Sequence, residues 1–444
     1  MNKEFQKKQN FFSFSDIDSA RKDRIMKFTS TEATPAPHVP PGVLRLTGAA
    51  KEDIPMYRIQ TMNKISPVGL NRFPSELYEV GDAVQDPQGI LVRSAKLLDL
   101  EFNPSLLAIA RAGVGVNNIP LDRCAAAGIP VFSTPGANAN AVKELVICAM
   151  LMGSRDIPGA IRWVREQAAS GVDVSTVVEK GKSAFIGPEL YKKTLGIIGL
   201  GAIGSIVANT AISLGMDVYG YDPFLSVDTA LRLDRHVHVV KDINDLYKRS
   251  DYITMHIHYT EKTAHMIDAD AIAAMKRGVR VINLARGEIV DDEAMLTALD
   301  TGMVAAYITD FPNNRLLTAP HVIAMPHLGA STPESEQNCA AMAVDTLRDY
   351  LESGNIRSSV NLPEMTMDRS GVQRLCVLHK NVPGMLANIT SLFGRDGVNV
   401  ENLSNKSRGD YAYTMVDLGS KVGDNVIEDV RRTANVIRVR SLEW

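Results

Sequence analysis

Three glycines in the middle of the chain have the spacing of a phosphate-binding turn. Gly199, Gly201 and Gly204 follow an apolar run at 194–198 and precede a helical pattern. The first glycine permits a tight bend, the second lets a pyrophosphate approach the backbone, and the third lets the helix pack on the strand. Free N–H groups of the first helical turn would face the phosphates. The predicted dinucleotide contacts are Gly199, Gly201, Ala202, Ile203 and Gly204.

An acid lies where such a turn requires one. The next apolar run, 217–221, ends at Asp222, about 20 residues after the glycines, where an aspartate accepts hydrogen bonds from the adenosine ribose hydroxyls. Residues 223–225 contain no arginine, so a 2′-phosphate would meet repulsion. The pattern predicts NAD rather than NADP, and a glycine turn of purely structural use is the alternative.

Two later segments carry side chains suited to hydroxy-acid oxidation. Arg286 follows the apolar run 279–283, and His327 follows the run 321–325. A guanidinium binds a carboxylate or 2-oxo acid through two parallel hydrogen bonds. A neutral imidazole accepts a hydroxyl proton as hydride leaves the carbon. From the residues alone, an arginine that pairs with a helix end remains the alternative for Arg286.

These side chains must be positioned by strands, and strand-like runs recur along the chain. Apolar runs separated by helix-length segments indicate parallel α/β sheets, which bind ligands at the carboxyl ends of their strands. A shorter βαββαβ pattern at 372–444 has the ferredoxin-like order. The strands expected before it are 57–61, 89–94, 107–113, 128–132, 194–198, 217–221, 252–256, 279–283, 305–308 and 321–325.

Composition excludes several other classes of protein. The 444 residues include 48 Lys+Arg and 51 Asp+Glu, and the net charge of −3 argues against a mainly electrostatic nucleic-acid binder. The uncharged run 195–216 is long enough to span a membrane, but its five glycines and its polar residues favour a strand, a turn and a helix. The four scattered cysteines predict neither a disulfide framework nor a zinc site, and they fit a reducing compartment.

Residues 1–55 differ from the rest of the chain. They contain phenylalanine clusters and a proline-rich run at 35–42, which cannot form a helix. Up to Lys27 they hold seven Lys/Arg and four Asp/Glu, whereas a transit peptide is poor in acids. We predict a disordered or loosely docked extension of a cytoplasmic protein, with organelle targeting as the alternative.

Together these motifs resemble those of one enzyme family. The glycine turn and the segments 283–291 and 325–332, in this order, are similar to the D-isomer-specific 2-hydroxyacid dehydrogenases. The resemblance covers residues 57–352 and implies an NAD-dependent enzyme. It further implies cofactor contacts at Leu284, Ala285, Thr309, Gly329 and Ala330.

The same resemblance implies a domain organisation. A doubly wound, Rossmann-type cofactor domain would be inserted into a flavodoxin-like substrate domain and followed by a ferredoxin-like regulatory domain. The implied divisions are an extension at 1–55, a substrate domain at 56–155 and 328–355, an NAD-binding domain at 156–327, a linker at 356–371 and the regulatory domain at 372–444.

Two loops nearer the start narrow the resemblance. Residues 90–94 and 111–118 are similar to those of the phosphoglycerate dehydrogenases within this family. The similarity implies oxidation of D-3-phosphoglycerate to 3-phosphohydroxypyruvate, the first step of L-serine biosynthesis. From the residues alone, an ordinary surface role for Arg93 remains the alternative. The implied substrate contacts are Arg93 and Ser94 for the phosphate, and Gly115, Val116 and Asn117 for the carboxylate region.

One segment departs from the family pattern. The family places a glutamate beside the catalytic histidine, where its charge stabilises the protonated imidazole. With Phe311 and Pro312 as the anchor, the glutamate position falls on Asn314 and the nicotinamide-contacting aspartate falls on Thr309. We therefore expect His327 to act as the base, either with Asp310 turned inward or with Asn314 in a weaker pair.

The last segment resembles the ACT regulatory domain. Residues 378–386 and 397–400 carry the similarity, which implies L-serine contacts at His379, Asn381 and Asn399. Amide and imidazole groups suit a small zwitterion. An ACT fold that only pairs with a second copy is the alternative.

Other activities remain open from the sequence. A related dehydrogenase would act on another 2-hydroxy acid, such as 2-hydroxyglutarate, and an NAD-sensing interaction protein would share the fold. A regulator with a decayed enzyme core would explain the missing glutamate. We expect a homodimer or homotetramer with a small phosphorylated hydroxy acid as substrate, and no metal, nucleic-acid or membrane partner.

Overall fold

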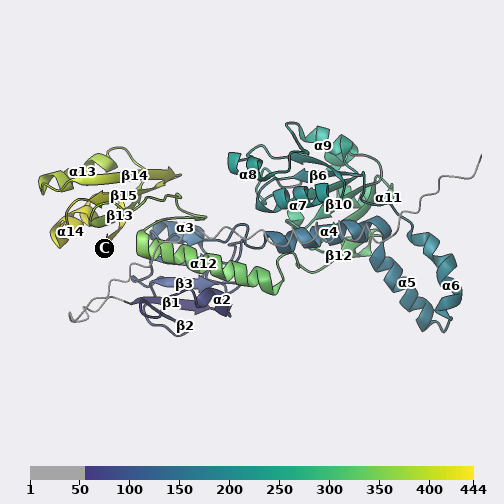
Figure 1. The fold of residues 1–444 in the computed structure, drawn as a ribbon, viewed down its shortest axis with the longest axis horizontal. Coiled ribbons are helices and arrows are strands. Elements are labelled where there is room, and N and C mark those ends of the chain that lie inside the picture. The colour runs from purple at the N-terminus through teal and green to yellow at the C-terminus, as the bar shows by residue number, and fades with distance from the viewer. Residues whose placement is uncertain (1–55) are drawn as a thin grey trace, which may run out of the picture. The chain divides into compact units, whose positions relative to one another are not determined.

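The computed structural model describes residues 56–444, so the extension predicted at 1–55 lies outside the described residues. The described residues form three β-sheets with their own helices (Figure 1). Two parallel α/β sheets precede an antiparallel sheet, which confirms the predicted fold class. In this part of the chain, no helix is long and apolar enough to cross a membrane.

The first sheet is parallel and flavodoxin-like, with the order β2-β1-β3-β4-β5. The predicted strand at 128–132 is shorter than expected, because Gly128 has a φ of 66° and Pro130 has no N–H to donate. Its strands are β1 (Tyr57–Met62), β2 (Tyr78–Gly81), β3 (Gly89–Val92), β4 (Ala108–Arg111) and β5 (Val131–Phe132).

Helices that are far apart in the sequence pack on the first sheet. The long helix α12 (Pro333–Ser353) packs beside α2 (Pro67–Leu70) and β4, and α3 (Leu121–Ala126) leads into β5. Val344 and Leu347 of α12 are buried in the same core as Ile59 and Leu91 of the sheet. This apolar face explains why a helix distant in sequence completes the first sheet.

The second sheet has the doubly wound order of dinucleotide-binding folds. Its seven parallel strands run β12-β11-β10-β9-β6-β7-β8, so the winding reverses between β6 and β9. Ligands bind at such a switch point, outside the carboxyl ends of the strands. The strands are β6 (Thr194–Ile198), β7 (Asp217–Tyr221), β8 (Val237–Val240), β9 (Tyr252–Met255), β10 (Val279–Asn283), β11 (Val304–Thr309) and β12 (Val322–Ala324).

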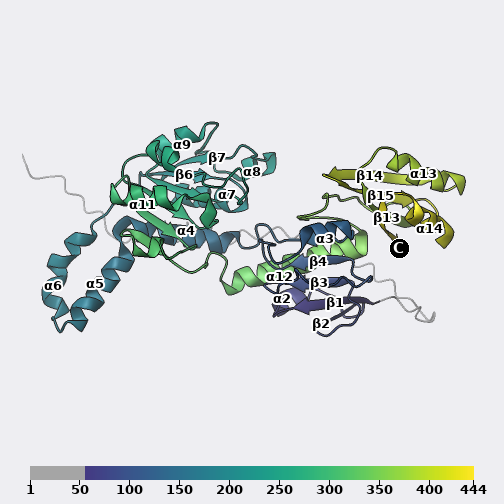
Figure 2. The same cartoon turned by 180° about the vertical axis from the view of Figure 1, so that it is seen from behind.

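Helices connect these strands and precede them. Figure 2 shows α4 beside the second sheet, with α5 and α6 forming a pair away from it. The helix pair was not predicted, and Ile161, Val164, Val172 and Val178 within it are exposed. The helices are α4 (Ala139–Arg155), α5 (Ile157–Ala169), α6 (Val174–Gly181), α7 (Ala202–Ser213), α8 (Val227–Arg232), α9 (Ile243–Arg249), α10 (Ala269–Ala273) and α11 (Asp292–Asp300).

The third sheet is antiparallel, with the order β14-β15-β13-β16. This is the ferredoxin-like order that the βαββαβ pattern predicted, and it is compatible with an ACT domain. Its elements are β13 (Gln373–Lys380), α13 (Met385–Arg395), β14 (Val400–Arg408), β15 (Tyr411–Leu418), α14 (Asp424–Arg432) and β16 (Val436–Glu443). The face opposite the helices shares a core with α12, through Cys376, Leu378, Tyr413, Met415 and Leu442.

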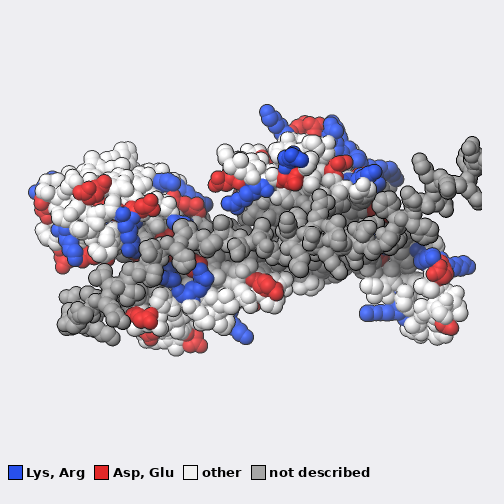
Figure 3. Space-filling view, in the orientation of Figure 1, with Lys and Arg blue, Asp and Glu red and all other residues white. Residues whose placement is uncertain are grey.

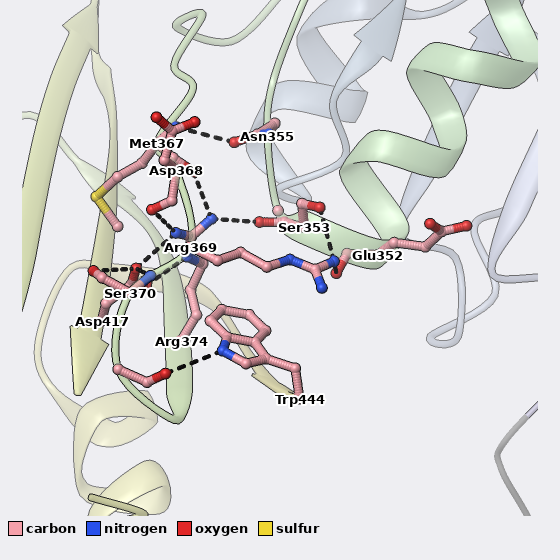
Figure 4. Close-up of polar contacts among 12 residues, drawn as sticks. Glu352, Ser353, Asn355, Met367, Asp368, Arg369, Ser370, Arg374, Asp417 and Trp444 are labelled. Carbon is pink, nitrogen blue, oxygen red and sulfur yellow. Dashed lines mark hydrogen bonds and ion pairs between the residues drawn. The ribbon is translucent and has the colours of Figure 1, made fainter. Parts of the chain in front are cut away.

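A buried ion pair joins β13 to β15 beneath the end of α12 (Figure 4). Arg374 Nε donates to Asp417 Oδ1 at 2.5 Å, and Arg374 Nη2 donates to Oδ2 at 2.7 Å. The remaining N–H groups donate to the carbonyl oxygens of Ser353, Met367 and Asp368. All five guanidinium donors are therefore satisfied in a site that excludes water.

The carboxyl end of α12 is capped by the same sheet. Arg440 of β16 donates to the carbonyl oxygens of Tyr350 and Leu351, and the hydroxyl of Tyr413 donates to that of Gly354. A cation at a helix C-terminus satisfies free carbonyls and complements the helix dipole. The third sheet is thus joined to the first by polar as well as apolar contacts.

Charge is mixed in sign on the part of the surface that is visible in Figure 3. On the face visible in Figure 3, lysine and arginine alternate with aspartate and glutamate over the third sheet and over the second. The visible surface shows no broad area of a single sign.

Candidate active site

The glycine turn joins β6 to α7 at the switch point of the second sheet. Gly199 has a φ of 89°, which favours glycine, and a Cβ on it would lie 2.6 Å from the carbonyl oxygen of His256. A Cβ on Gly204 would collide with the carbonyl oxygen of Gly199. A Cβ on Gly201, by contrast, would meet nothing within 4 Å. Internal packing therefore requires the first and third glycines, whereas the second borders open space before α7.

Asp222 is held beside this turn at the end of β7. Its Oδ2 accepts the N–H of Leu200 at 2.9 Å, and its Oδ1 accepts the N–H of Phe224 at 2.9 Å. Each carboxylate oxygen has a second lone pair available. The carboxylate is therefore fixed in direction and can accept further hydrogen bonds at the turn.

Arg286 and His327 both lie close to the ring of Phe311. The guanidinium carbon of Arg286 is 5.7 Å from the centroid of the Phe311 ring, and the ring centroids of Phe311 and His327 are 4.6 Å apart. These residues follow β10, β11 and β12, so the carboxyl edge of the second sheet brings them together. A cation that can bind anions and an imidazole that can move protons therefore lie beside the same aromatic ring.

Asp310 is turned inward in the next position of the same loop. It is 1% exposed, and its Oδ2 accepts the N–H of Gly329 at 3.1 Å. Its Oδ1 is buried without a hydrogen-bond partner among the described residues. Burial raises the pKa of Asp310, and the N–H of Gly329 and the charge of His327 act in the opposite direction. Asn314 is exposed instead.

Replacing Asp310 by asparagine is expected to lower kcat by roughly 10- to 100-fold, because a charged group would no longer stabilise the protonated His327. A pH–rate profile should also show the acid limb moving to lower pH.

The same substitution is expected to raise the free energy of unfolding near pH 7, although it lowers kcat. An aspartate whose pKa is raised by folding costs stability as pH rises above about 4, so the variant gains on the wild type towards pH 7.

Asn314→Glu is the matched comparison, since it restores the family's acid at the family's position. An unchanged profile for Asp310→Asn would remove Asp310 from the mechanism.

The other predicted cofactor contacts lie in the loops at this edge. Thr309 is buried, and its hydroxyl accepts the N–H of Phe311 at 3.0 Å, so its side chain supports the loop that carries the ring. Leu284 is also buried, and Ala285 and Ala330 are partly exposed. A Cβ on Gly329 would touch Asp310 Oδ2 at 3.5 Å.

A third arginine, which was not among the predicted contacts, lies beside two that were. Nε of Arg111 donates to the carbonyl oxygen of Arg93 at 3.1 Å. Burial lowers the pKa of Arg111, and the positive charges of Arg93 and Arg286 lower it further. The signal in the sequence was an arginine at the end of an apolar run, a feature that Arg111 shares with Arg93.

The loops of the first sheet complete this group. A Cβ on Gly115 would lie 3.2 Å from Nη2 of Arg286, so the β4–α3 loop meets an arginine of the second sheet. The backbone N–H of Ser94 donates to Asn63 Oδ1 at 3.1 Å. Val116 is partly exposed and Asn117 is exposed. Arg93, Arg111 and Arg286 are hereafter called the arginine cluster.

The loop between β5 and α4 is a feature that sequence reasoning missed. Thr134 Oγ1 and Asn138 Oδ1 are buried without hydrogen-bond partners among the described residues. A Cβ on Gly136, whose φ is 86°, would lie 3.2 Å from the Cβ of Ala202. Two unpaired polar groups thus lie in a loop that touches the first residue of α7. The signal was a Thr-Pro-Gly-Ala-Asn run directly after a buried strand.

Comparison with known proteins identifies the family. Residues 147–329 match the model of the D-isomer specific 2-hydroxyacid dehydrogenase, NAD binding domain. The D-3-phosphoglycerate dehydrogenase of Haemophilus influenzae is 31% identical over 379 residues, which cover 82% of this chain and 88% of that protein. The chain belongs to the D-isomer-specific 2-hydroxyacid dehydrogenase family.

Some relatives are longer than the Haemophilus influenzae protein. The D-3-phosphoglycerate dehydrogenase of Synechocystis sp. is 36% identical over 326 residues, which cover 71% of this chain and 56% of that protein. The chain thus spans little more than half the length of that relative. A solved structure, the NAD⁺-bound 3-phosphoglycerate dehydrogenase of Entamoeba histolytica, is 26% identical with a TM-score of 0.54, and the match covers 69% of this chain and 99% of that one.

The glycine turn and Asp222 have the features that NAD binding requires. Gly201 leaves open space before α7, whose first turn contains no acidic residue to repel a pyrophosphate. Asp222 follows the glycines at the distance where this motif carries its ribose-binding acid, and residues 223–225 contain no arginine. These observations fit the NAD-binding domain that the family model describes.

Replacing Asp222 by asparagine is expected to weaken NAD binding by roughly tenfold or more, because a hydrogen bond to a charged acceptor contributes about 1.5–3 kcal/mol. Titration calorimetry with NAD would measure the change. Asp228→Asn is the matched control, since Asp228 lies in the first turn of the neighbouring helix α8. Equal affinities for the Asp222 variant and the wild type would show that the ribose is not bound there.

One of the predicted effector contacts is buried within the third sheet. His379 is 2% exposed; its Nδ1 donates to the carbonyl oxygen of Lys380 at 2.8 Å, and its Nε2 is 2.8 Å from Thr414 Oγ1. Both ring nitrogens are occupied within the chain, so neither is available to a ligand in this conformation. The side chain lies on the same face of β13 as Leu375 and Val377, and its hydrogen bond to Thr414 joins β13 to β15.

The other two predicted effector contacts are exposed. Asn381 Nδ2 donates to the carbonyl oxygen of Gly409 at 3.1 Å, and Asn399 Nδ2 donates to Glu401 Oε1 at 3.0 Å. Both side chains retain unused hydrogen-bonding capacity. Serine contact at these positions stays a prediction.

Proposed function

We propose that this chain is an NAD-dependent dehydrogenase that oxidises D-3-phosphoglycerate to 3-phosphohydroxypyruvate, the first step of L-serine biosynthesis. The observation that carries the proposal is the arginine cluster, in which burial and the positive charges of Arg93 and Arg286 lower the pKa of Arg111. A substrate with both a phosphate and a carboxylate offsets such a cluster, whereas a plain 2-hydroxy acid brings one anionic group. The relatives named D-3-phosphoglycerate dehydrogenase support the same substrate.

Each side chain has a role that follows from its position. Arg93 and Ser94 would bind the phosphate, with Arg111 supporting the backbone of Arg93. Arg286 would bind the carboxylate and polarise the carbonyl oxygen that forms. His327 would accept the hydroxyl proton, and the buried carboxylate of Asp310 would stabilise the resulting imidazolium. Bound NAD would supply the hydride acceptor.

The loops of both sheets would exclude water from the reacting carbon. Gly115 lies against the side chain of Arg286, so the substrate would be enclosed from the side of the first sheet. Removal of water strengthens the attraction between the guanidiniums and the anionic substrate.

Turnover of 3-phosphohydroxypyruvate, followed as NADH consumption, tests the proposal. Activity on this substrate with little on hydroxypyruvate or 2-oxoglutarate would support it. Preference for 2-oxoglutarate would assign the chain to another activity of the family, and binding of NADH without turnover of any acid would indicate a sensing role. Addition of L-serine to the same assay tests regulation through Asn381 and Asn399.

Assembly, compartment and domain boundaries are also proposals. We infer a homodimer or homotetramer, supported by the exposed apolar side chains on α5 and α6. All four cysteines are free thiols, which supports a reducing compartment such as the cytoplasm. The strands of the first and second sheets fall within the proposed ranges 56–155 and 156–327, and α12 falls within 328–355.

A further inference from the structure

An acidic side chain is paired with the arginine cluster. Arg93 Nη2 lies 2.6 Å from Glu336 Oε1, and the two residues are 243 positions apart in the chain. Among the described residues, this is the one ion pair that any member of the cluster forms with an acid. The carboxylate of Glu336 is therefore paired with the guanidinium of Arg93, to which we assign the substrate phosphate.

The position of Glu336 is set by the start of α12. Thr332 caps this helix, its Oγ1 accepting the N–H of Ser335 at 3.1 Å, and its carbonyl oxygen accepts the N–H of Glu336 at 3.1 Å. A carboxylate in the first turn of a helix is stabilised by the helix dipole. The same turn follows the loop of His327 along the chain, so Glu336 is held close to the reaction site by local structure.

Arg93 is held just as firmly on the opposite side. Its carbonyl oxygen accepts Nε of Arg111, and the N–H groups of Ser94 and Ala95 donate to Asn63 Oδ1 at 3.1 and 2.6 Å. The loop is therefore fixed before a substrate arrives. The side chains of Arg93 and Glu336 are 40% and 43% exposed, so both can change partners without loss of a buried contact.

We propose that Glu336 is a specificity-determining residue that competes with the anionic group of the substrate for Arg93. This inference rests on the proposed function for the identity of that group as a phosphate. Glu336 offsets the mutual repulsion of the arginines when no substrate is bound. An incoming phosphate must displace the carboxylate of Glu336 from Arg93 or bind beside it. Acids with a weaker negative charge therefore gain little binding energy from Arg93. The affinity for phosphorylated acids is also lower than it would be without Glu336.

Glu336→Gln tests the competition, because an amide of the same shape carries no charge. We expect the KM for 3-phosphohydroxypyruvate to fall by about three- to tenfold, since a partly exposed ion pair is screened by water and contributes modestly. The change should fall on KM rather than on kcat. Glu336→Ala should shift KM in the same direction, which guards against a defect specific to glutamine.

Glu334→Gln is the matched control. It removes the same charge from the same helical turn and leaves the pair with Arg93 intact, so the KM should stay at the wild-type value. An unchanged or raised KM for both Glu336 variants would overturn the proposal, because a residue that merely orients Arg93 would raise KM when lost. A fall in KM that persists in the Arg93→Ala background would overturn it as well.

A second measurement separates this inference from the proposed function. Inorganic phosphate is titrated into the NADH-loaded protein by calorimetry, and Glu336→Gln should tighten its binding by about three- to tenfold. Tighter phosphate binding together with no turnover of 3-phosphohydroxypyruvate by the wild type would reject the proposed activity and retain the role of Glu336. If the wild type turns over 3-phosphohydroxypyruvate but Glu336→Gln changes neither phosphate binding nor KM, the proposed activity is retained and the role of Glu336 is rejected.

Discussion

Replacing His327 by glutamine is expected to lower kcat/KM by about 10²- to 10⁴-fold, the usual contribution of a positioned general base. Glutamine approximates the size of the imidazole and retains hydrogen-bonding groups, but it cannot carry the proton that leaves the hydroxyl. The contact between His327 and Phe311 contains no hydrogen bond, so the loop should keep its conformation. The loss should therefore fall on kcat, with NAD affinity preserved.

The matched control for this experiment is His236→Gln. His236 is exposed just before β8, at the amino end of the strands of the second sheet, and its Nδ1 lies 2.7 Å from Asp234 Oδ1. The same substitution there should leave kcat/KM within about twofold, as for surface changes remote from the reacting groups. A His327→Gln variant with near wild-type turnover would mean that another group, such as a bound water, takes the proton.

The second large effect concerns stability. Asp417→Ala is expected to lower the free energy of unfolding by about 3–5 kcal/mol, because it leaves the fully buried guanidinium of Arg374 without its anionic partner. The backbone carbonyls that share Arg374 would keep it in place and so prolong its isolation from water. The desolvation cost of one uncompensated charge explains the size of the effect.

Trp444 provides a local probe for that measurement. Its ring lies 4.8 Å from the guanidinium carbon of Arg369 and 5.3 Å from that of Arg374, and its Nε1 donates to the carbonyl oxygen of Gly371 (Figure 4). In a Trp163→Phe background, tryptophan fluorescence during chemical denaturation would report on the third sheet alone, since the chain has two tryptophans.

An exposed ion pair in the same sheet provides the control. Lys421 and Glu443 are 2.6 Å apart with side chains 60% and 50% exposed, so Glu443→Gln should cost less than about 1 kcal/mol. Replacing both Arg374 and Asp417 by apolar residues should recover part of the loss, because no charge remains buried. Equal costs for Asp417→Ala and Glu443→Gln would contradict the account of the buried pair.

The sequence by itself determined the features that depend on local spacing. The glycine turn after 194–198, the acid at Asp222 and the positions of Arg286 and His327 after strands were all predicted, and they lie at the carboxyl edge of the second sheet. A strand followed by a turn and a helix is a local unit, so its pattern is visible in consecutive residues. The βαββαβ order of 372–444 was predicted for the same reason.

The tertiary structure decided which polar side chains face one another. Asp310 and Asn314 were equal candidates in sequence, and only packing against the loop of Gly329 buries the aspartate. His379 matched a ligand-contacting pattern, yet burial in the core of the third sheet occupies both of its nitrogens. Burial depends on elements that are distant in the chain, so a motif cannot reveal it.

The arginine cluster shows the same division. Arg93 and Arg286 were found from their places at strand ends, where Arg111 also lies, whereas the pairing of Glu336 with Arg93 became visible only when α12 was packed on the first sheet. Contacts between residues some hundreds of positions apart leave no periodic signal, because no local conformational preference links the partners. Short motifs therefore identify the residues that could carry the chemistry of this protein, and long-range packing determines which charged and polar groups surround them.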